Sequence, residues 1–156
     1  MQLSKGQVLG IMENYNNDPQ QLIVVLLDIQ AASGINCVEK QWAELVSDVL
    51  KVPLSKVYEV LSFYAMFSTQ CRGEYIIEIC KSTPCHFCGG KELTEWFEEA
   101  AGIKIGETTP DGKISLFFTS CIGACDTGPA VKIGDDVFGN LTKEKAKALV
   151  KELRSS

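Results

Sequence analysis

The 156-residue sequence predicts an α/β protein in two parts, a helical segment over residues 1–70 and a β-α-β-β-α domain over residues 71–156. Three observations lead to this prediction. Apolar residues recur at helical spacing through roughly the first 67 positions, and the pattern changes to a period of two after "STQCRGEY" (68–75). Four of the seven cysteines also form two close pairs, each at the end of a predicted strand.

The first part is expected to contain several helices. Asp18 followed by Pro19 is typical of an N-cap with proline at the first helical position, and Gly34 is a stop signal. Two more helices, on either side of Pro53, are expected over residues 39–50 and 55–67, with the apolar residues Trp42, Leu45, Val46, Val49, Val57, Val60, Leu61, Tyr64 and Phe67 at helical spacing. Such residues are typical of a protein core rather than of cofactor contacts.

The second part alternates strands and helices. "EYIIEIC" (74–80) predicts a strand, "KELTEWFEEAAG" (91–102) a helix that ends at Gly102, and "KISLFFTSC" (113–121) a second strand. "AVKIGDDVFGNL" (130–141) predicts a hairpin with its turn at residues 134–136, and Thr142 caps a last helix. A crossover through a helix indicates that the first two strands are parallel, as in a small thioredoxin-like layer.

Charge and hydropathy exclude several functions. The net charge of −5 and the pI near 4.9 argue against nucleic-acid binding, and residues 56–67 carry only Lys56 as a cation, so a recognition helix is not expected there. The longest apolar run, "LIVVLL" (22–27), is too short to span a bilayer, and "MQLSKGQVLG" lacks signal-peptide character. We therefore expect a cytoplasmic protein, in which an odd number of cysteines indicates metal or redox chemistry rather than a disulfide framework.

The paired cysteines predict a metal centre. The pairs are Cys80 and Cys85, with four residues between them, and Cys121 and Cys125, with three. Because parallel strands joined by one crossover end side by side, four thiolates would converge from two loops, as a four-thiolate iron–sulfur cluster requires. Glycines at 123 and 128 would let the second loop bend closely, and hydroxyls at 82 and 83 in the first loop could donate to sulfur.

Two other interpretations remain open at this point. Cys85 and Cys88 form a C-x-x-C between a strand and a helix, which is typical of a thioredoxin-like dithiol oxidoreductase, and Pro129 stands where such a fold has its cis-proline. A structural zinc module is the other, although both cysteine spacings are at the limit of its usual range. The single histidine, His86, gives little support to hydrolytic chemistry, and no Gly-rich dinucleotide fingerprint follows a strand.

The cysteine spacing, with thirty-five residues between the pairs, resembles that of the thioredoxin-like 2Fe–2S ferredoxins. These include the small iron–sulfur subunit of NADH:quinone oxidoreductase and its homologues in NAD(P)-linked hydrogenases and formate dehydrogenases. "VPLSKVYEVLSFYAMF" (52–67), "CIGACDTGPAVKI" (121–133) and "VFGNLTKEKAKALV" (137–150) carry the likeness along nearly the whole chain. The sequence departs from many members at residues 81–84 of the first loop, where they have Gly, and at Cys71, where they have Pro.

The resemblance implies a function. Cys80, Cys85, Cys121 and Cys125 would hold one 2Fe–2S cluster, with Cys88 outside the ligand set. The chain would be a non-catalytic electron-transport subunit of an oxidoreductase hetero-oligomer. Flavin and NAD(P) would be bound by a larger flavin- and iron–sulfur-containing, NAD(P)H-oxidising subunit, and the helices of residues 1–70 would dock there.

Overall fold

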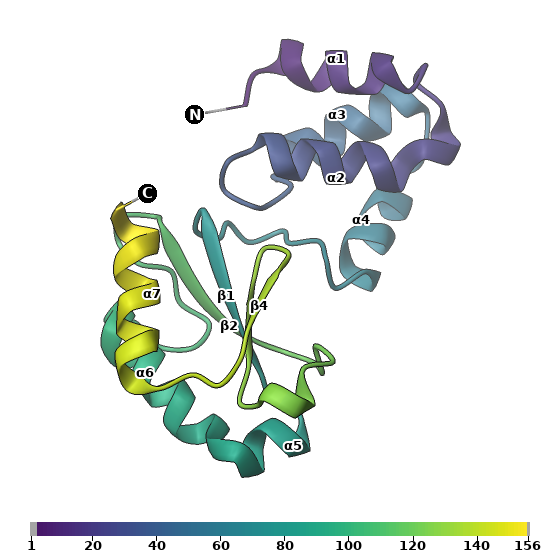
Figure 1. The fold of residues 1–156 in the computed structure, drawn as a ribbon. Coiled ribbons are helices and arrows are strands. Elements are labelled where there is room, and N and C mark those ends of the chain that lie inside the picture. Colours follow the sequence, from purple (N-terminus) through teal and green to yellow (C-terminus); the bar gives the residue numbers. More distant parts are fainter. Residues whose placement is uncertain (1–2, 156) are drawn as a thin grey trace. The chain divides into compact units, whose positions relative to one another are not determined.

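The computed structural model describes residues 3–155 and divides into two compact units, Met1–Arg72 and Gly73–Ser156 (Figure 1). The first unit contains α1 (Lys5–Asn14), the 3-10 turn η1 (Pro19–Gln21), α2 (Leu22–Ala32), α3 (Lys40–Leu50) and α4 (Leu54–Phe63). The second contains β1 (Tyr75–Cys80), α5 (Thr83–Cys85), η2 (His86–Gly90), α6 (Lys91–Ala101), β2 (Ile114–Thr119), η3 (Cys125–Thr127), β3 (Val131–Ile133), β4 (Asp136–Phe138) and α7 (Lys143–Ser155). Among residues 3–155, no helix is long and apolar enough to cross a membrane.

Local signals mark the start of α1 and both ends of the segment that contains α2. Ser4 and Gln7 form a capping box at the start of α1. Asp18 caps the turn that leads into α2 by accepting a hydrogen bond from the Gln20 N–H, and Gly34 follows the end of α2 in a left-handed conformation. The predicted start and stop signals of this helix are therefore confirmed.

The helix expected over residues 55–67 ends earlier, at Phe63. Tyr64 is in an extended conformation, so residues 64–67 leave the helix. Phe63 and Phe67 would share a face of a continued helix, yet Phe63 is 78% exposed whereas Phe67 is buried at 5%. The chain therefore buries Phe67 from a loop, which helical periodicity alone cannot reveal.

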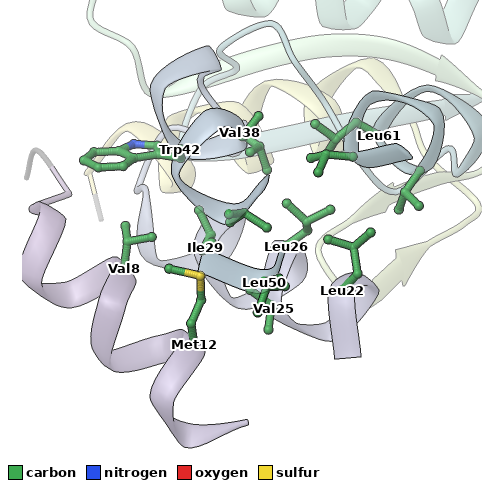
Figure 2. Packing of buried hydrophobic residues seen from close by; sticks show 14 of the residues in the cluster. Val8, Met12, Leu22, Val25, Leu26, Ile29, Val38, Trp42, Leu50 and Leu61 are labelled. Carbon is green, nitrogen blue, oxygen red and sulfur yellow. The ribbon is translucent and has the colours of Figure 1, made fainter. Parts of the chain in front are cut away.

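The core of the first unit consists of side chains from all four α-helices and from the loops before α3 and after α4. Figure 2 shows that α1 contributes Val8 and Met12 to the cluster that also contains residues of α2 and α3. α2 is apolar around most of its surface and buries Leu22, Val25, Leu26 and Ile29 in this core. This packing stabilises a helical unit that has its own hydrophobic core.

The second unit is built on a four-stranded sheet in the order β2-β1-β3-β4. β1 and β2 are parallel, and β3 is antiparallel to both β1 and β4, so the predicted β-α-β-β-α order and parallel first pair are confirmed. The hairpin turn is shorter than predicted, because Asp136 already belongs to β4 and pairs with Ile133. Figure 1 shows α6 and α7 side by side on one face of this sheet, and both helices contribute to its core.

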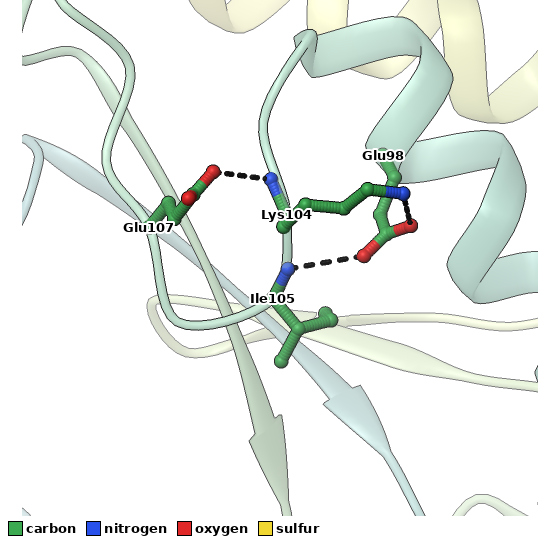
Figure 3. A network of polar contacts seen from close by, with 4 residues as sticks. All are labelled: Glu98, Lys104, Ile105 and Glu107. Carbon is green, nitrogen blue, oxygen red and sulfur yellow. Dashed lines mark hydrogen bonds and ion pairs between the residues drawn. The ribbon is translucent and has the colours of Figure 1, made fainter.

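The connection from α6 to β2 is fixed by a small polar network (Figure 3). Glu98 accepts a hydrogen bond from Lys104 Nζ at 2.7 Å through one carboxylate oxygen and from the Ile105 N–H at 3.1 Å through the other. Glu107 accepts a hydrogen bond from the Lys104 N–H at 2.7 Å. The network therefore closes the loop back onto the last turns of α6.

Replacing Glu98 by Gln is expected to destabilise the protein by about 0.5–1 kcal/mol at pH 7, because an ion pair becomes a neutral contact. The Lys104 hydrogen bond, helped by the Ile105 amide, lowers the pKa of Glu98. The stabilisation is thus present above the unfolded-state pKa and is lost as the pH falls through the lower folded-state value. The shift of the urea unfolding midpoint relative to wild type measures this loss of stability, with Glu95→Gln as the control. A midpoint shift in Glu98→Gln that is as large at acidic pH as at pH 7 would contradict the role given to the ionised Glu98.

Candidate metal centre

The parallel pairing of β1 and β2 places the two cysteine loops next to each other. Cys80 is the last residue of β1 and lies opposite Thr119, the last residue of β2, while Cys121 follows two residues later. The backbone continues this alignment, because the Lys81 N–H donates to the Thr119 carbonyl at 3.1 Å. Both loops therefore begin at the same edge of the sheet.

The first pair is buried. Cys80 and Cys85 are only 3% and 1% exposed, and their sulfurs are hydrogen bonded to each other. Cys85 belongs to the short helix α5 rather than to an open loop. Burial raises the pKa of Cys85, and so does the hydrogen bond with Cys80, although the Ala130 N–H donates to its sulfur.

The second pair lies at the surface. The Sγ atoms of Cys121 and Cys125 are 3.9 Å apart, and both residues are exposed. Gly123 has a φ of 80°, a left-handed conformation that favours glycine, and its N–H donates to Cys121. This hydrogen bond is the main reason that the pKa of Cys121 is lowered, whereas the hydrogen bond with Cys121 raises the pKa of Cys125.

Ser82 connects the two loops. Its side chain hydrogen bonds to both Cys80 and Cys121. Burial would raise the pKa of Cys80, but hydrogen bonds from the Ser82 hydroxyl and amide, with smaller contributions from other donors, lower it overall. The site therefore favours thiolate, the form in which cysteine binds metal, at one sulfur of each pair.

The spacing of the second pair fits two ligands of one metal ion. Two thiolates on one tetrahedral ion with metal–sulfur bonds of about 2.3 Å lie about 3.8 Å apart, close to the 3.9 Å between Cys121 and Cys125. Among residues 3–155, no three or more His, Cys, Asp or Glu side chains are grouped around a point that could hold one metal ion. Electrostatic interactions nevertheless connect the two pairs, because Cys80 acts on both Cys121 and Cys125, and Cys125 acts on Cys85.

The structure also locates Cys88 and Pro129, the other two residues of interest in this part of the sequence. Cys88 lies in η2 and is exposed. Pro129 follows a cis peptide bond, as a thioredoxin-like fold predicts. The amides of Ile122 and Ala130, which donate to Cys80 and Cys85, were not identified from the sequence. Backbone donors of this kind have no residue-type signal, although Ala130 directly follows the notable Pro129.

These features define a thioredoxin-like α/β protein with a four-cysteine site at the carboxyl ends of two parallel strands. The sequence model of the thioredoxin-like [2Fe-2S] ferredoxin family matches residues 8–154, so the chain belongs to this family and carries one 2Fe–2S cluster.

Relatives agree with this assignment, and a solved structure shares the fold. The chain is 34% identical over 146 residues to the NADP-reducing hydrogenase subunit HndA of Solidesulfovibrio fructosivorans, covering 94% of this chain and 84% of the relative. It is 37% identical over 130 residues to an NADH-quinone oxidoreductase subunit of Rickettsia felis, covering 83% and 78%. Among solved structures, an air-oxidised NAD+-reducing [NiFe]-hydrogenase matches with a TM-score of 0.74 at 22% identity, which shows the fold alone; the match covers 86% of this chain and 23% of that one.

The hydrogen bonds from Ser82 predict an effect on the cluster's reduction potential. Replacing Ser82 by Ala is expected to lower the potential by about 20–60 mV, because donors to ligand sulfurs stabilise the more negative reduced state. A redox titration followed by visible absorption measures the shift, with exposed Thr83→Ala as control. An unchanged or higher potential in Ser82→Ala would contradict the role given to this hydroxyl.

Proposed function

We propose that this chain is the 2Fe–2S electron-relay subunit of an NAD(P)-linked oxidoreductase complex, with Cys80, Cys85, Cys121 and Cys125 as the cluster ligands. The observation that carries this proposal is the convergence of two cysteine pairs at one sheet edge, supported by hydrogen-bond donors from Ser82, Ile122, Gly123 and Ala130. A 2Fe–2S cluster supplies one-electron transfer, and the protein sets its position and surroundings. This role fits a chain that relays electrons without transforming a substrate itself.

The exposure of the site favours electron exchange with a partner. Cys121 and Cys125 are on the surface, so one side of the cluster would be covered by little protein. Two aromatic side chains of the same unit are also exposed, Phe87 at 82% and Phe118 at 46%, and each is near a ligand in the sequence. Exposed apolar side chains around an open redox site are typical of a surface that docks another protein.

We infer that the partner is a flavin- and iron–sulfur-containing subunit that oxidises NAD(P)H. Relatives in the hydrogenase and NADH-quinone oxidoreductase complexes are subunits of larger assemblies, which supports a hetero-oligomer here. The helical unit has its own exposed apolar residues at the end of α4 and in the loop that follows, with Phe63 78% and Met66 49% exposed. These residues are candidates for contacts that hold the helical unit against the partner.

The dithiol alternative has weaker support. Cys85, which would have to react with a substrate disulfide, is 1% exposed, and its sulfur hydrogen bonds to Cys80 and the Ala130 amide. A redox-active C-x-x-C normally exposes its attacking sulfur. We therefore assign Cys85 to the metal site and leave Cys88 outside it.

Anaerobic purification with metal analysis and electron paramagnetic resonance tests the proposal. About two irons and two sulfides per chain are expected, with a paramagnetic signal that appears on reduction. Identifying the subunits that co-purify with the tagged chain tests the partner, and a flavoprotein that binds NAD(P) is expected among them. Zinc without iron, or an insulin-reducing activity that requires Cys88, would refute the relay function.

A further inference from the structure

A third pair of cysteines lies in the helical unit, apart in sequence from the four proposed ligands. Cys37 is in the loop before α3, and Cys71 is near the end of the unit, 34 residues later. Their Sγ atoms are 2.7 Å apart, compared with about 2.05 Å in a disulfide bond. No disulfide bond joins them in this structure.

The backbone holds the two cysteine segments together. The Val38 N–H donates to the Ser68 carbonyl at 2.8 Å, and the Arg72 N–H donates to the Ile35 carbonyl at 2.8 Å. These hydrogen bonds flank the cysteines on both sides, because each involves a residue within three positions of Cys37 or Cys71. The short sulfur–sulfur distance is therefore a consequence of a fixed backbone arrangement rather than of two independent side-chain rotations.

The two thiols differ in their access to solvent. Cys37 is 0% exposed, whereas Cys71 is exposed. Burial, together with the hydrogen bond to Cys71, raises the pKa of Cys37 to about 12. A reagent in solution would thus react with Cys71 first. Cys37 stays protonated until it reacts with the modified Cys71.

We propose that Cys37 and Cys71 form a thiol–disulfide redox site, separate from the iron–sulfur site, that small disulfides such as glutathione disulfide oxidise. The Cys71 thiolate attacks one sulfur of the reagent, which forms a mixed disulfide and releases one thiolate. Cys37 then attacks the Cys71 sulfur and displaces the second small thiolate, which takes up the proton that Cys37 loses. Two protein thiols are oxidised to one disulfide, and one reagent disulfide is reduced to two thiols.

The oxidised form would connect the loop before α3 to the end of the helical unit. The closed loop contains α3 and α4, so the bond would restrict the unfolded chain over about half of this unit. Oxidation would stabilise the helical unit without changing any of the four proposed cluster ligands. The family resemblance does not account for this pair, because many members have proline where this chain has Cys71.

Peptide mapping of the full-length protein with its cluster tests the proposal. After anaerobic incubation with glutathione disulfide, remaining thiols are alkylated and the protein is digested with trypsin. Cleavage after lysine and arginine yields peptides 6–40 and 57–72, each with a single cysteine. Most chains are expected to contain these two peptides joined, with a mass lower by two hydrogen atoms than their sum, while the visible absorption of the cluster is retained.

Three variants make the outcome decisive. In Cys37→Ser, the reaction is expected to stop at a stable mixed disulfide on Cys71. In Cys71→Ser, Cys37 is expected to remain unmodified. Cys88→Ser is the control for an exposed cysteine and is expected to form the Cys37–Cys71 disulfide as wild type does. Wild-type protein in which Cys71 is modified but never joined to Cys37 would overturn the proposal. Joining of Cys71 to Cys88 or to a second chain would also overturn it. The mapping of wild type decides the question even if a variant fails to fold.

Discussion

Replacing Cys80 or Cys85 by Ser is expected to reduce the iron and sulfide content from about two of each per chain to nearly none. Both sulfurs are buried and hydrogen bonded to each other. A serine oxygen is a poor ligand for iron, and the one cysteine left in the first pair could not by itself replace the two thiolates that the second iron needs. Iron and acid-labile sulfide analysis after anaerobic purification measures the loss.

Cys88→Ser is the matched control for these variants. Cys88 is three residues from Cys85 in the sequence, but it is exposed and lies in η2, at the start of the turn that leads into α6. The variant is expected to retain the full iron and sulfide content and an unchanged visible spectrum. Equal loss of iron in Cys80→Ser, Cys85→Ser and Cys88→Ser would mean that the ligand set is wrong.

Much of the site could be predicted because it depends on features that the sequence displays directly. The strand patterns ending at Cys80 and near Cys121, with a helix between them, predict a parallel pair, and the observed register brings the strand ends together. Pro129 before a short strand likewise predicted the thioredoxin-like cis peptide. The predicted topology, together with the cysteine spacing, therefore placed the two cysteine pairs at the same end of the sheet.

Contacts that depend on backbone position could not be predicted. Tyr64 leaves the helix so that Phe67 is buried, although both fit the apolar pattern of a continued helix. Ser82 and Thr83 are similar donors in the sequence, yet Ser82 is the one whose bonds connect Cys80 to Cys121. The proximity of Cys37 to Cys71 also requires the tertiary structure, because 34 residues separate them.

The segment that contains Cys80 and Cys85 also requires a glycine at position 90. The chain folds back at η2, where Gly89 has a φ of 99°, and this brings Gly90 close to the backbone of Cys85. A Cβ atom at Gly90 would lie 2.8 Å from the Cys85 carbonyl oxygen and 3.2 Å from its carbonyl carbon. Both neighbouring atoms belong to the backbone, so relief of the collision must move the backbone of Cys85 or of residue 90.

Gly90→Ala is therefore expected to lower the stability of the second unit by about 1–3 kcal/mol and to speed the loss of the cluster severalfold. The half-life of visible absorption in the presence of an iron chelator measures the second effect. Gly10→Ala is the control, because a Cβ atom there meets no atom within 4 Å and alanine favours the helix α1. Equal half-lives for Gly90→Ala and Gly10→Ala would mean that the Cys85 segment can shift without disturbing its sulfur, and that the close packing of η2 does not position this ligand.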